Sequence, residues 1–439
     1  MSGSASARLA QRYALQLSTA WRAWFDSPAD NQRLAGQFRQ TLAVDDLLEP
    51  VPADLWPGFM LPDTLPIVSN DYGDWWCVRV GSDNEITEVI QWMHAGGDWL
   101  PVGADIFEAI LWDSLQRWRG QFAGRQPAAH QYPERPGPET ANSSPQPSNM
   151  AWLAEHLTTS ATHLRHLLDL AAAGDYRKSL ELLQQHNWSA YAAACELIEV
   201  HLQGGLVRLA DAQLASRCGI NWSPDFTSWL FDTERIPHQA RQLLLEVCPE
   251  LQFAQDWQAA GAGAERVIEH RSDLSWAGDI AGWAAERCGN QTAAIAHYFQ
   301  HRYSSAFTDQ SVRLRSHWFN ERYGKFSVAQ LARLQPHLTP EQRDDPYLQV
   351  LWHEPSVRVR TAVREYWLAR ARQAEQLHDF AAAYNAYYQA GWDLGAERLS
   401  DYVEILDGLT RSARQANWLA RAAIAQTHAD SLRSRLIHP

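Results

Sequence analysis

Several features of secreted, membrane-bound and metal-binding proteins are missing from this sequence. None of its apolar runs approaches the roughly 20 residues that a membrane-spanning helix needs. The first residues, MSGSASARLAQRYALQ, lack the apolar core of a secretory signal peptide. The five cysteines are scattered, odd in number and without a Cys-x-x-Cys pair, which argues against a disulfide framework or a zinc motif. We therefore expect a cytoplasmic protein whose thiols are small buried hydrophobes: Cys77, Cys195, Cys218, Cys248 and Cys288.

Sequence signatures of catalysis are missing as well. The chain contains no phosphate-binding loop, nucleophile elbow, dinucleotide fingerprint or helix-borne zinc motif. The glycine-rich string at residues 261–263 lacks a third glycine and a preceding strand, and it predicts a turn between helices. His163 and His166 are spaced to face one metal ion, but no acidic or cysteine ligand is placed to complete the site. The sequence therefore predicts a protein that is not an enzyme and holds no cofactor or metal ion.

Basic residues are scarce in one long stretch, between Gln40 and Asp113. Arg79 is its single base against fourteen acids, so this stretch accounts for the whole formal net charge of -13. The acids are Asp45, Asp46, Glu49, Asp54, Asp63, Asp71, Asp74, Asp83, Glu85, Glu88, Asp98, Asp105, Glu108 and Asp113. Such a field repels nucleic-acid phosphates and speeds encounters with basic proteins. The stretch predicts a basic protein partner and no nucleic acid, with solubility as the alternative explanation.

Apolar spacing predicts helices near the N-terminus. Six large apolar side chains recur every three or four residues and lie along one stripe of a helix: Leu9, Tyr13, Leu17, Trp21, Trp24 and Phe25. A second helix is expected from Asn31 to Leu42. Five prolines then follow between Glu49 and Pro66. Because each proline removes a backbone donor and disfavours helix at the preceding residue, this Pro-rich segment is expected to be extended or turned.

Three strands and a helix are predicted next. The strand candidates are Leu65–Val68, Asp74–Val80 and Ile86–Met93. Turn-forming clusters at residues 70–73 and 81–84 separate them, which predicts an antiparallel meander. Apolar residues at helical spacing in Ala104–Trp118 predict a helix that covers one face of the sheet.

The chain changes character after residue 118. Residues 119–150 hold six prolines and almost no large aliphatic side chains, and they predict a linker. Beyond it, stretches from Leu167, Ile280 and Ala369 each place a small turn before a helix rich in alanine and aromatics. Because small residues let paired helices approach closely, we expect degenerate tetratricopeptide-like hairpins. The predicted organisation is an α+β domain with an antiparallel sheet and flanking helices over 1–118, the linker, and an all-α, solenoid-like domain over 151–439.

The run from Leu65 to Leu111 carries a family resemblance. Its elements, in order, are a Leu-Pro-Ile strand, a Gly73-Asp74 step, an aromatic strand, a strand ending in Trp-Met-His, and a helix containing Phe107. In this order they resemble the SUKH superfamily, which includes the fungal regulator of cell-wall synthesis and many bacterial immunity proteins. The chain departs from the family before Leu65, where it is proline-rich. The resemblance covers roughly a tenth of the chain.

Two hypotheses for function follow. The resemblance implies a recognition domain whose bacterial members bind and neutralise toxins, many of them basic, so the first hypothesis is an immunity-type protein whose acidic domain docks a basic toxin domain. The expected contact residues lie on turns and strand ends, with charge beside aromatic anchors: Asp71, Asp74, Trp75, Glu85, Glu88, Asp98 and Trp99. The second hypothesis is a scaffold or regulator whose helical repeats hold a protein client. The sequence leaves open the oligomeric state and which domain carries the main binding surface.

Overall fold

The chain forms two compact units. The computed structural model describes residues 3–27, 34, 36–94, 97–122, 147–157, 161–173, 175–185, 190–202, 216–217, 219, 232–249, 251–305, 307 and 325–437. Unit 1 comprises Met1–Asp113, Tyr303–Thr308 and Gln335–Pro439, and unit 2 comprises Ser114–Arg302 and Asp309–Leu334. The C-terminal residues thus group with the N-terminal domain. The predicted domain boundaries stay a prediction, and residues 123–146 of the predicted linker lie outside the described residues.

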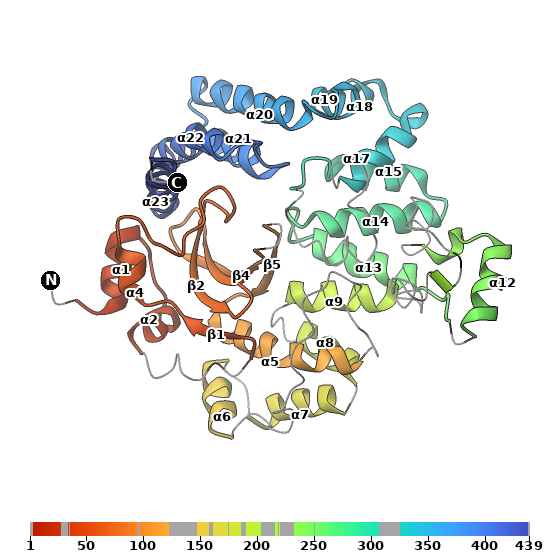
Figure 1. Cartoon of the computed structure of the whole chain (residues 1–439), viewed down its shortest axis with the longest axis horizontal. Coiled ribbons are helices and arrows are strands. Elements are labelled where there is room, and N and C mark those ends of the chain that lie inside the picture. Colours follow the sequence, from red (N-terminus) through yellow and green to blue (C-terminus); the bar gives the residue numbers. More distant parts are fainter. Residues whose placement is uncertain are drawn as a thin grey trace. The chain divides into compact units, whose positions relative to one another are not determined.

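Unit 1 is built on a five-stranded antiparallel sheet in the order β1-β2-β3-β4-β5 (Figure 1). Its strands are β1 (Phe38–Thr41), β2 (Thr64–Asn70), β3 (Trp75–Val80), β4 (Ile86–Trp92) and β5 (Trp99–Gly103). The three predicted strands and the meander are confirmed as β2, β3 and β4. The predicted helix over Ala104–Trp118 is confirmed as α5 (Ile106–Phe122).

The helix predicted over Asn31–Leu42 is wrong where that range is described, because Phe38–Thr41 forms edge strand β1. The Phe38 ring stacks on Trp76 of β3, with centroids 4.6 Å apart. The Phe38 amide donates to Asp113 of α5 at 3.2 Å. These tertiary contacts outweigh a weak local helical pattern.

The N-terminal apolar stripe is divided between two helices, α1 (Ala5–Tyr13) and α2 (Thr19–Asp26). Ala14 adopts a left-handed conformation and ends α1, and the Ser18 hydroxyl accepts a hydrogen bond from Trp21 N to cap α2. All six stripe side chains are nevertheless buried. Figure 1 shows α1, α2 and the short helix α4 (Val44–Leu48) beside the sheet.

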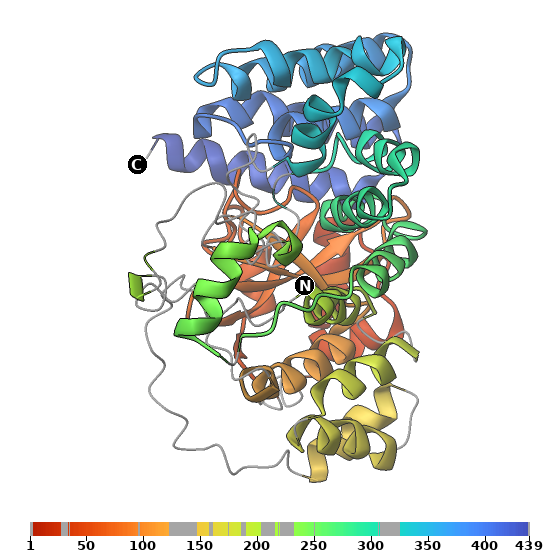
Figure 2. The same ribbon diagram turned by 90° about the vertical axis from the view of Figure 1, so that its right-hand side faces the viewer.

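The C-terminal helices complete unit 1. They are α18 (Pro340–Arg343), α19 (Pro346–His353), α20 (Val359–Gln376), α21 (Phe380–Trp392), α22 (Tyr402–Gln415) and α23 (Leu419–Ile437). Each helix from α19 to α21 packs against the next along the chain, as do α21 with α22 and α22 with α23, and Figure 2 shows this stack in blue. On α23, Arg421 Nε donates to the Val80 carbonyl at 2.9 Å, and His428 Nε2 lies 3.3 Å from the Thr64 carbonyl. Side chains of α23 therefore satisfy backbone groups of β2 and β3.

Unit 2 consists of packed helices. They are α6 (Pro147–His156), α7 (Ala161–Ala172), α8 (Tyr176–Gln185), α9 (Ala190–Leu202), α12 (His238–Val247), α13 (Trp257–Ile268), α14 (Ser275–Arg287), α15 (Gln291–Gln300) and α17 (Phe326–Arg333). Apart from α12, they pack in chain order, with α9 against α13. The three predicted hairpins are confirmed as α7–α8, α14–α15 and, in unit 1, α20–α21. Their likeness to tetratricopeptide repeats stays a prediction.

The glycines at residues 261–263 do not form the predicted turn but lie inside α13. A Cβ atom on Gly261 would approach the Ala284 side chain of α14 to 2.7 Å. Gly261 therefore allows close packing of α13 on α14, and tertiary proximity offsets its low helix propensity.

One side-chain contact recurs in the helix stacks of both units. A glutamate in the last turn of one helix binds a tyrosine of the next helix, 12 residues later, and an arginine of a third helix. The two instances are Glu286 with Tyr298 and Arg333 in unit 2, and Glu375 with Tyr387 and Arg411 in unit 1. The repetition indicates that three successive helices, rather than a single hairpin, form the unit of packing.

We predict acid sensitivity from two buried histidines. Burial lowers the pKa of His428 to about 4, and burial together with the neighbouring His297 lowers the pKa of His301 to about 4. The unfolded chain takes up these protons near pH 6.5, so stability is complete above that pH and is lost as the pH falls toward 4. Each histidine should cost about 2 kcal/mol at pH 5.

The matched variant is His428→Gln, whose amide can still donate to Thr64. Urea unfolding of the full chain at pH 7 and pH 5 should show that this variant loses about 2 kcal/mol less than the wild type between the two pH values. An equal loss in both proteins would contradict the assignment.

Candidate partner-binding surface

The seven predicted contact residues do not form one exposed surface. Asp71 and Glu85 are exposed on turns. The other five are at most 9% exposed: Asp74, Trp75, Glu88, Asp98 and Trp99. The expectation that turns and strand ends expose these charges and rings is therefore wrong for five residues, and their contact with a partner stays a prediction.

The predicted tryptophans are buried because they form a ladder across the sheet. Trp75 of β3 lies opposite Trp92 of β4, and Trp92 lies opposite Trp99 of β5. Neighbouring aromatic side chains on adjacent strands stabilise a sheet. The Trp92 indole also donates to the Phe59 carbonyl at 3.2 Å, which ties the Pro-rich segment to the sheet.

Glu88 and Trp99 are brought together by Arg79, the single base of the acidic stretch. Arg79 pairs with Asp63 and with Glu88, each at 3.1 Å, and its guanidinium lies 4.9 Å from the Trp99 ring centroid. A half-buried arginine held this way satisfies carboxylates that would otherwise be costly to desolvate. These charges therefore act inside the fold.

Asp74 closes the β2–β3 turn. Its carboxylate accepts hydrogen bonds from the Asn70 side chain at 3.1 Å and from the His94 amide at 3.1 Å. The His94 ring nitrogen lies 2.9 Å from the same carboxylate. Asp74 thus joins the turn to the end of β4.

The fourteen acids divide into an internal and an external set. Five are buried: Asp63, Asp74, Glu88, Asp98 and Asp113. Six are exposed: Asp45, Asp46, Glu49, Asp71, Asp83 and Glu85. Three of the exposed acids fall within α4 or directly after it, so this region carries the densest external negative charge of the stretch.

Exposed apolar side chains follow these α4 acids in the chain. Trp56 is 46% exposed and Phe59 is 50% exposed, both in the Pro-rich segment. Leu399, at the start of the short helix η6 (Leu399–Asp401), is 41% exposed and lies 3.2 Å from the position of a Cβ atom on Gly58. We call the set Asp46, Glu49, Asp54, Trp56, Phe59 and Leu399 the acidic–aromatic patch.

Arg435 of α23 fixes the patch. Its guanidinium donates to the carbonyls of Ala53 at 2.8 Å and Leu55 at 2.7 Å, and it lies 5.2 Å from the Trp56 ring centroid. Prolines leave the segment few backbone donors for regular structure, so this side chain supplies the hydrogen bonds that hold it. Trp56 is therefore presented on a rigid support.

The acids of the patch repel one another. Burial raises the pKa of Asp54, the Asp46 carboxylate raises it further, and Arg435 lowers it. A cation brought to this position would relieve that repulsion. The local electrostatics therefore favour a positively charged partner.

The sequence contained a signal for this surface that went unused. Trp56 and Phe59 flank a Pro-Gly step in a segment where regular structure is disfavoured, and the acids of residues 45–54 precede it. Large aromatics in such a segment must either fold back into the core or remain exposed. Nothing in the sequence near Leu399 indicates that it joins them.

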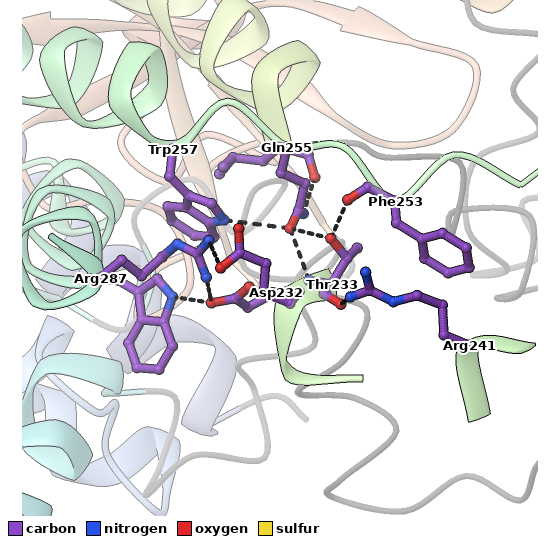
Figure 3. Close-up of polar contacts among 10 residues, drawn as sticks. Asp232, Thr233, Arg241, Phe253, Gln255, Trp257 and Arg287 are labelled. Carbon is purple, nitrogen blue, oxygen red and sulfur yellow. Dashed lines mark hydrogen bonds and ion pairs between the residues drawn. The ribbon is translucent and has the colours of Figure 1, made fainter. Parts of the chain in front are cut away.

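A second polar cluster lies in unit 2 (Figure 3). Asp232 is 1% exposed and accepts hydrogen bonds from the Trp283 indole at 2.9 Å and from Arg287. The Thr233 amide donates to Gln255 at 2.9 Å. Because these polar groups find their partners within the chain, the cluster anchors Asp232 to α14 and Thr233 to Gln255, just before α13.

In the described part of the chain, no cluster of three or more His, Cys, Asp or Glu side chains could hold a metal ion. Within the same residues, no helix is both long enough and apolar enough to span a bilayer. Cys77, Cys195 and Cys248 are buried as expected, but Cys288, just after α14, is exposed. Cys218 lies outside the described residues.

Comparison of the chain with protein-family models, curated proteins and solved structures finds no match. The resemblance to the SUKH superfamily therefore stays a prediction. The case for function depends on the geometry of the chain itself.

The Asp232 cluster yields a stability prediction with a matched control. Asp232→Ala leaves the Arg287 guanidinium and the Trp283 indole without this acceptor and should lower the free energy of unfolding by about 3 kcal/mol. Glu234 pairs with the same Arg287 at 2.6 Å, but its side chain is 72% exposed. Glu234→Ala should cost less than about 1 kcal/mol in the same urea titration. Equal losses for the two variants would contradict the anchoring role.

Proposed function

We propose that the chain is a cytoplasmic, non-catalytic protein-binding protein of the immunity type, which holds a basic protein, a toxin domain, on the acidic–aromatic patch. The observation that carries the proposal is the exposure of Trp56 and Phe59 in a segment that directly follows the exposed acids Asp46 and Glu49. The predicted SUKH resemblance of the adjoining strands agrees with this role.

The charge of the patch supports a basic partner. Asp46 and Glu49 are exposed, and Asp54 is half-buried next to Asp46. A surface with this imbalance steers positively charged proteins toward it and repels nucleic acid. The steering weakens as salt screens the charges.

The apolar members of the patch support specific binding rather than a nonspecific ionic contact. Tryptophan and other aromatic anchors dominate the energy of protein interfaces, especially when they are rigid and ringed by polar groups. Arg435 and the Trp92–Phe59 hydrogen bond hold this segment in place before a partner arrives. Little conformational entropy is then lost on binding.

The alternative is a scaffold whose helical repeats hold a client. The stacked helices of unit 2 favour it, because such stacks offer extended binding surfaces. A truncation at residue 150 does not separate the two functions cleanly, since residues 335–439 belong to unit 1. Point variants of the full chain are the appropriate test.

The test is a pull-down of the tagged full-length protein from its native cells, washed over a salt series, with bound proteins quantified by mass spectrometry. We expect one basic protein, released progressively as salt rises. The double variant Trp56→Ala and Phe59→Ala should retain at least about tenfold less of this basic protein than the wild type does, as expected for interface anchors. Both side chains are half exposed, so the fold should be little affected.

Charge reversal supplies the matched control. Asp46→Lys with Glu49→Lys should weaken capture at low salt, whereas Asp83→Lys with Glu85→Lys, on the β3–β4 turn outside the patch, changes the net charge equally and should have a smaller effect. If both pairs of substitutions weaken capture equally, the patch has no special role and only the overall negative charge attracts the partner. Clients retained by all variants and at all salt concentrations would favour the scaffold.

A further inference from the structure

Four residues of one short segment, Tyr303, Ser304, Ser305 and Phe307, belong to unit 1, whereas the chain on either side belongs to unit 2. We call these four residues the docked segment. The Trp99 amide of edge strand β5 donates to the Phe307 carbonyl at 3.0 Å. The Ser305 hydroxyl donates to the Trp392 carbonyl at the end of α21. A main-chain hydrogen bond to a sheet edge, with side chains in flanking pockets, is how many domains hold extended peptides.

The first pocket receives the Tyr303 ring. Tyr303 lies edge-on to Tyr347 of α19, with centroids 4.9 Å apart, and edge-on to Trp367 of α20, at 5.2 Å. Its hydroxyl lies 3.4 Å from the Asp345 carboxylate that caps α19. Aromatic rings in this arrangement attract one another beyond their burial.

This pocket is fixed independently of its occupant. Asp393, which is 0% exposed, accepts hydrogen bonds from the Tyr347 hydroxyl at 2.5 Å and the Trp367 indole at 2.7 Å. Both receiving rings are therefore held in orientation by one buried carboxylate. A preorganised site of this kind loses little entropy when it is filled.

The second pocket receives the Phe307 ring between two glycines. A Cβ atom on Gly395 would lie 3.0 Å from this ring, and one on Gly97 would lie 3.8 Å from it. The Phe59 carbonyl is 3.5 Å from the same Gly97 position, and the Tyr402 hydroxyl is 3.7 Å from the Gly395 position. The Phe307 ring therefore lies close to the main chain of Phe59, a residue of the acidic–aromatic patch.

The docked segment is less buried than the rings that it contacts. Tyr347 and Trp367 are 0% and 6% exposed and belong to the core of unit 1. Tyr303 and Phe307 remain only half-buried in their pockets. The rings of the segment are therefore more exposed than the rings that they contact, and less buried elements open at lower free energy than the core does.

We propose that the docked segment is an intramolecular peptide ligand, and that the slot between β5, α19, α20 and α21 is a docking site for a partner segment of the same chemistry. That chemistry is an aromatic ring, a serine two positions later and a second aromatic ring two positions after that. A tethered ligand has an effective concentration in the millimolar range, so the slot stays filled until a partner displaces it. The inference does not rest on the proposed function, because the chain's own peptide serves as the probe.

The first test uses the full-length double variant Tyr303→Ala and Phe307→Ala with a fluorescent peptide of residues 301–309, HRYSSAFTD. Fluorescence anisotropy should give saturable binding to the variant with a Kd of roughly 10–100 μM, and none to the wild type over the same range. The control peptide HRASSAATD should not bind either protein. A variant with an unchanged thermal transition that fails to bind HRYSSAFTD would overturn the proposal.

The second test needs no variant and therefore holds even if the variant does not fold. Unlabelled HRYSSAFTD is titrated into the wild-type protein to several millimolar, above the effective concentration of the tethered segment. The Phe307 amide resonance of the protein should shift in a saturable way, because the peptide displaces the tethered segment from the slot. No shift of this resonance, or an equal shift with HRASSAATD, would mean that the segment is a permanent part of the core.

Discussion

The contact between α23 and the β2–β3 hairpin is the constraint on which unit 1 depends. His428 and Thr64 are 364 positions apart in the chain, and Arg421 and Val80 are 341 apart, yet each pair shares a hydrogen bond. Each contact gives a strand carbonyl a side-chain donor, worth about 1 kcal/mol. Helix α23 therefore contributes to the stability of the N-terminal sheet.

The same helix determines which surface the protein offers. Arg435, near the end of α23, holds the Pro-rich segment by two carbonyls and by the face of Trp56. Asp63 and Glu88 turn inward to Arg79, and Asp74 turns to the β2–β3 turn, while the acids around α4 remain outside. A partner at the sheet therefore meets less negative charge than the sequence suggests. A partner at α4 meets more of it.

Local pattern was sufficient for most of the secondary structure. Alternation and turn chemistry gave β2, β3 and β4, and the small turns before alanine-rich helices gave all three helix pairs. Edge strand β1 was missed because its pairing depends on Phe38 meeting Trp76, a contact made only in the folded sheet. For the same reason, no local pattern indicates that α23 returns to β2 or that Tyr303 enters unit 1.

The candidate site could be predicted only in part. Acidic charge beside aromatic rings was the chemistry expected, but five of the seven residues lie in or next to strands whose two faces are both covered, as Trp76 and Cys77 show by being at most 1% exposed. Alternation along a strand separates two faces without saying how many of them are buried. The exposed aromatic side chains are instead Trp56 and Phe59, in the segment where prolines prevent regular structure.

The central claim is that a basic partner contacts the acidic–aromatic patch, and site-specific photo-crosslinking in native cells tests it most directly. A photoreactive amino acid is placed at Phe59 in one protein and at Glu85 in another, and the crosslinked proteins are identified by mass spectrometry. We predict that a basic protein is captured from position 59 and not from position 85. Capture from position 85 alone would contradict the account and return the binding surface to the β3–β4 turn.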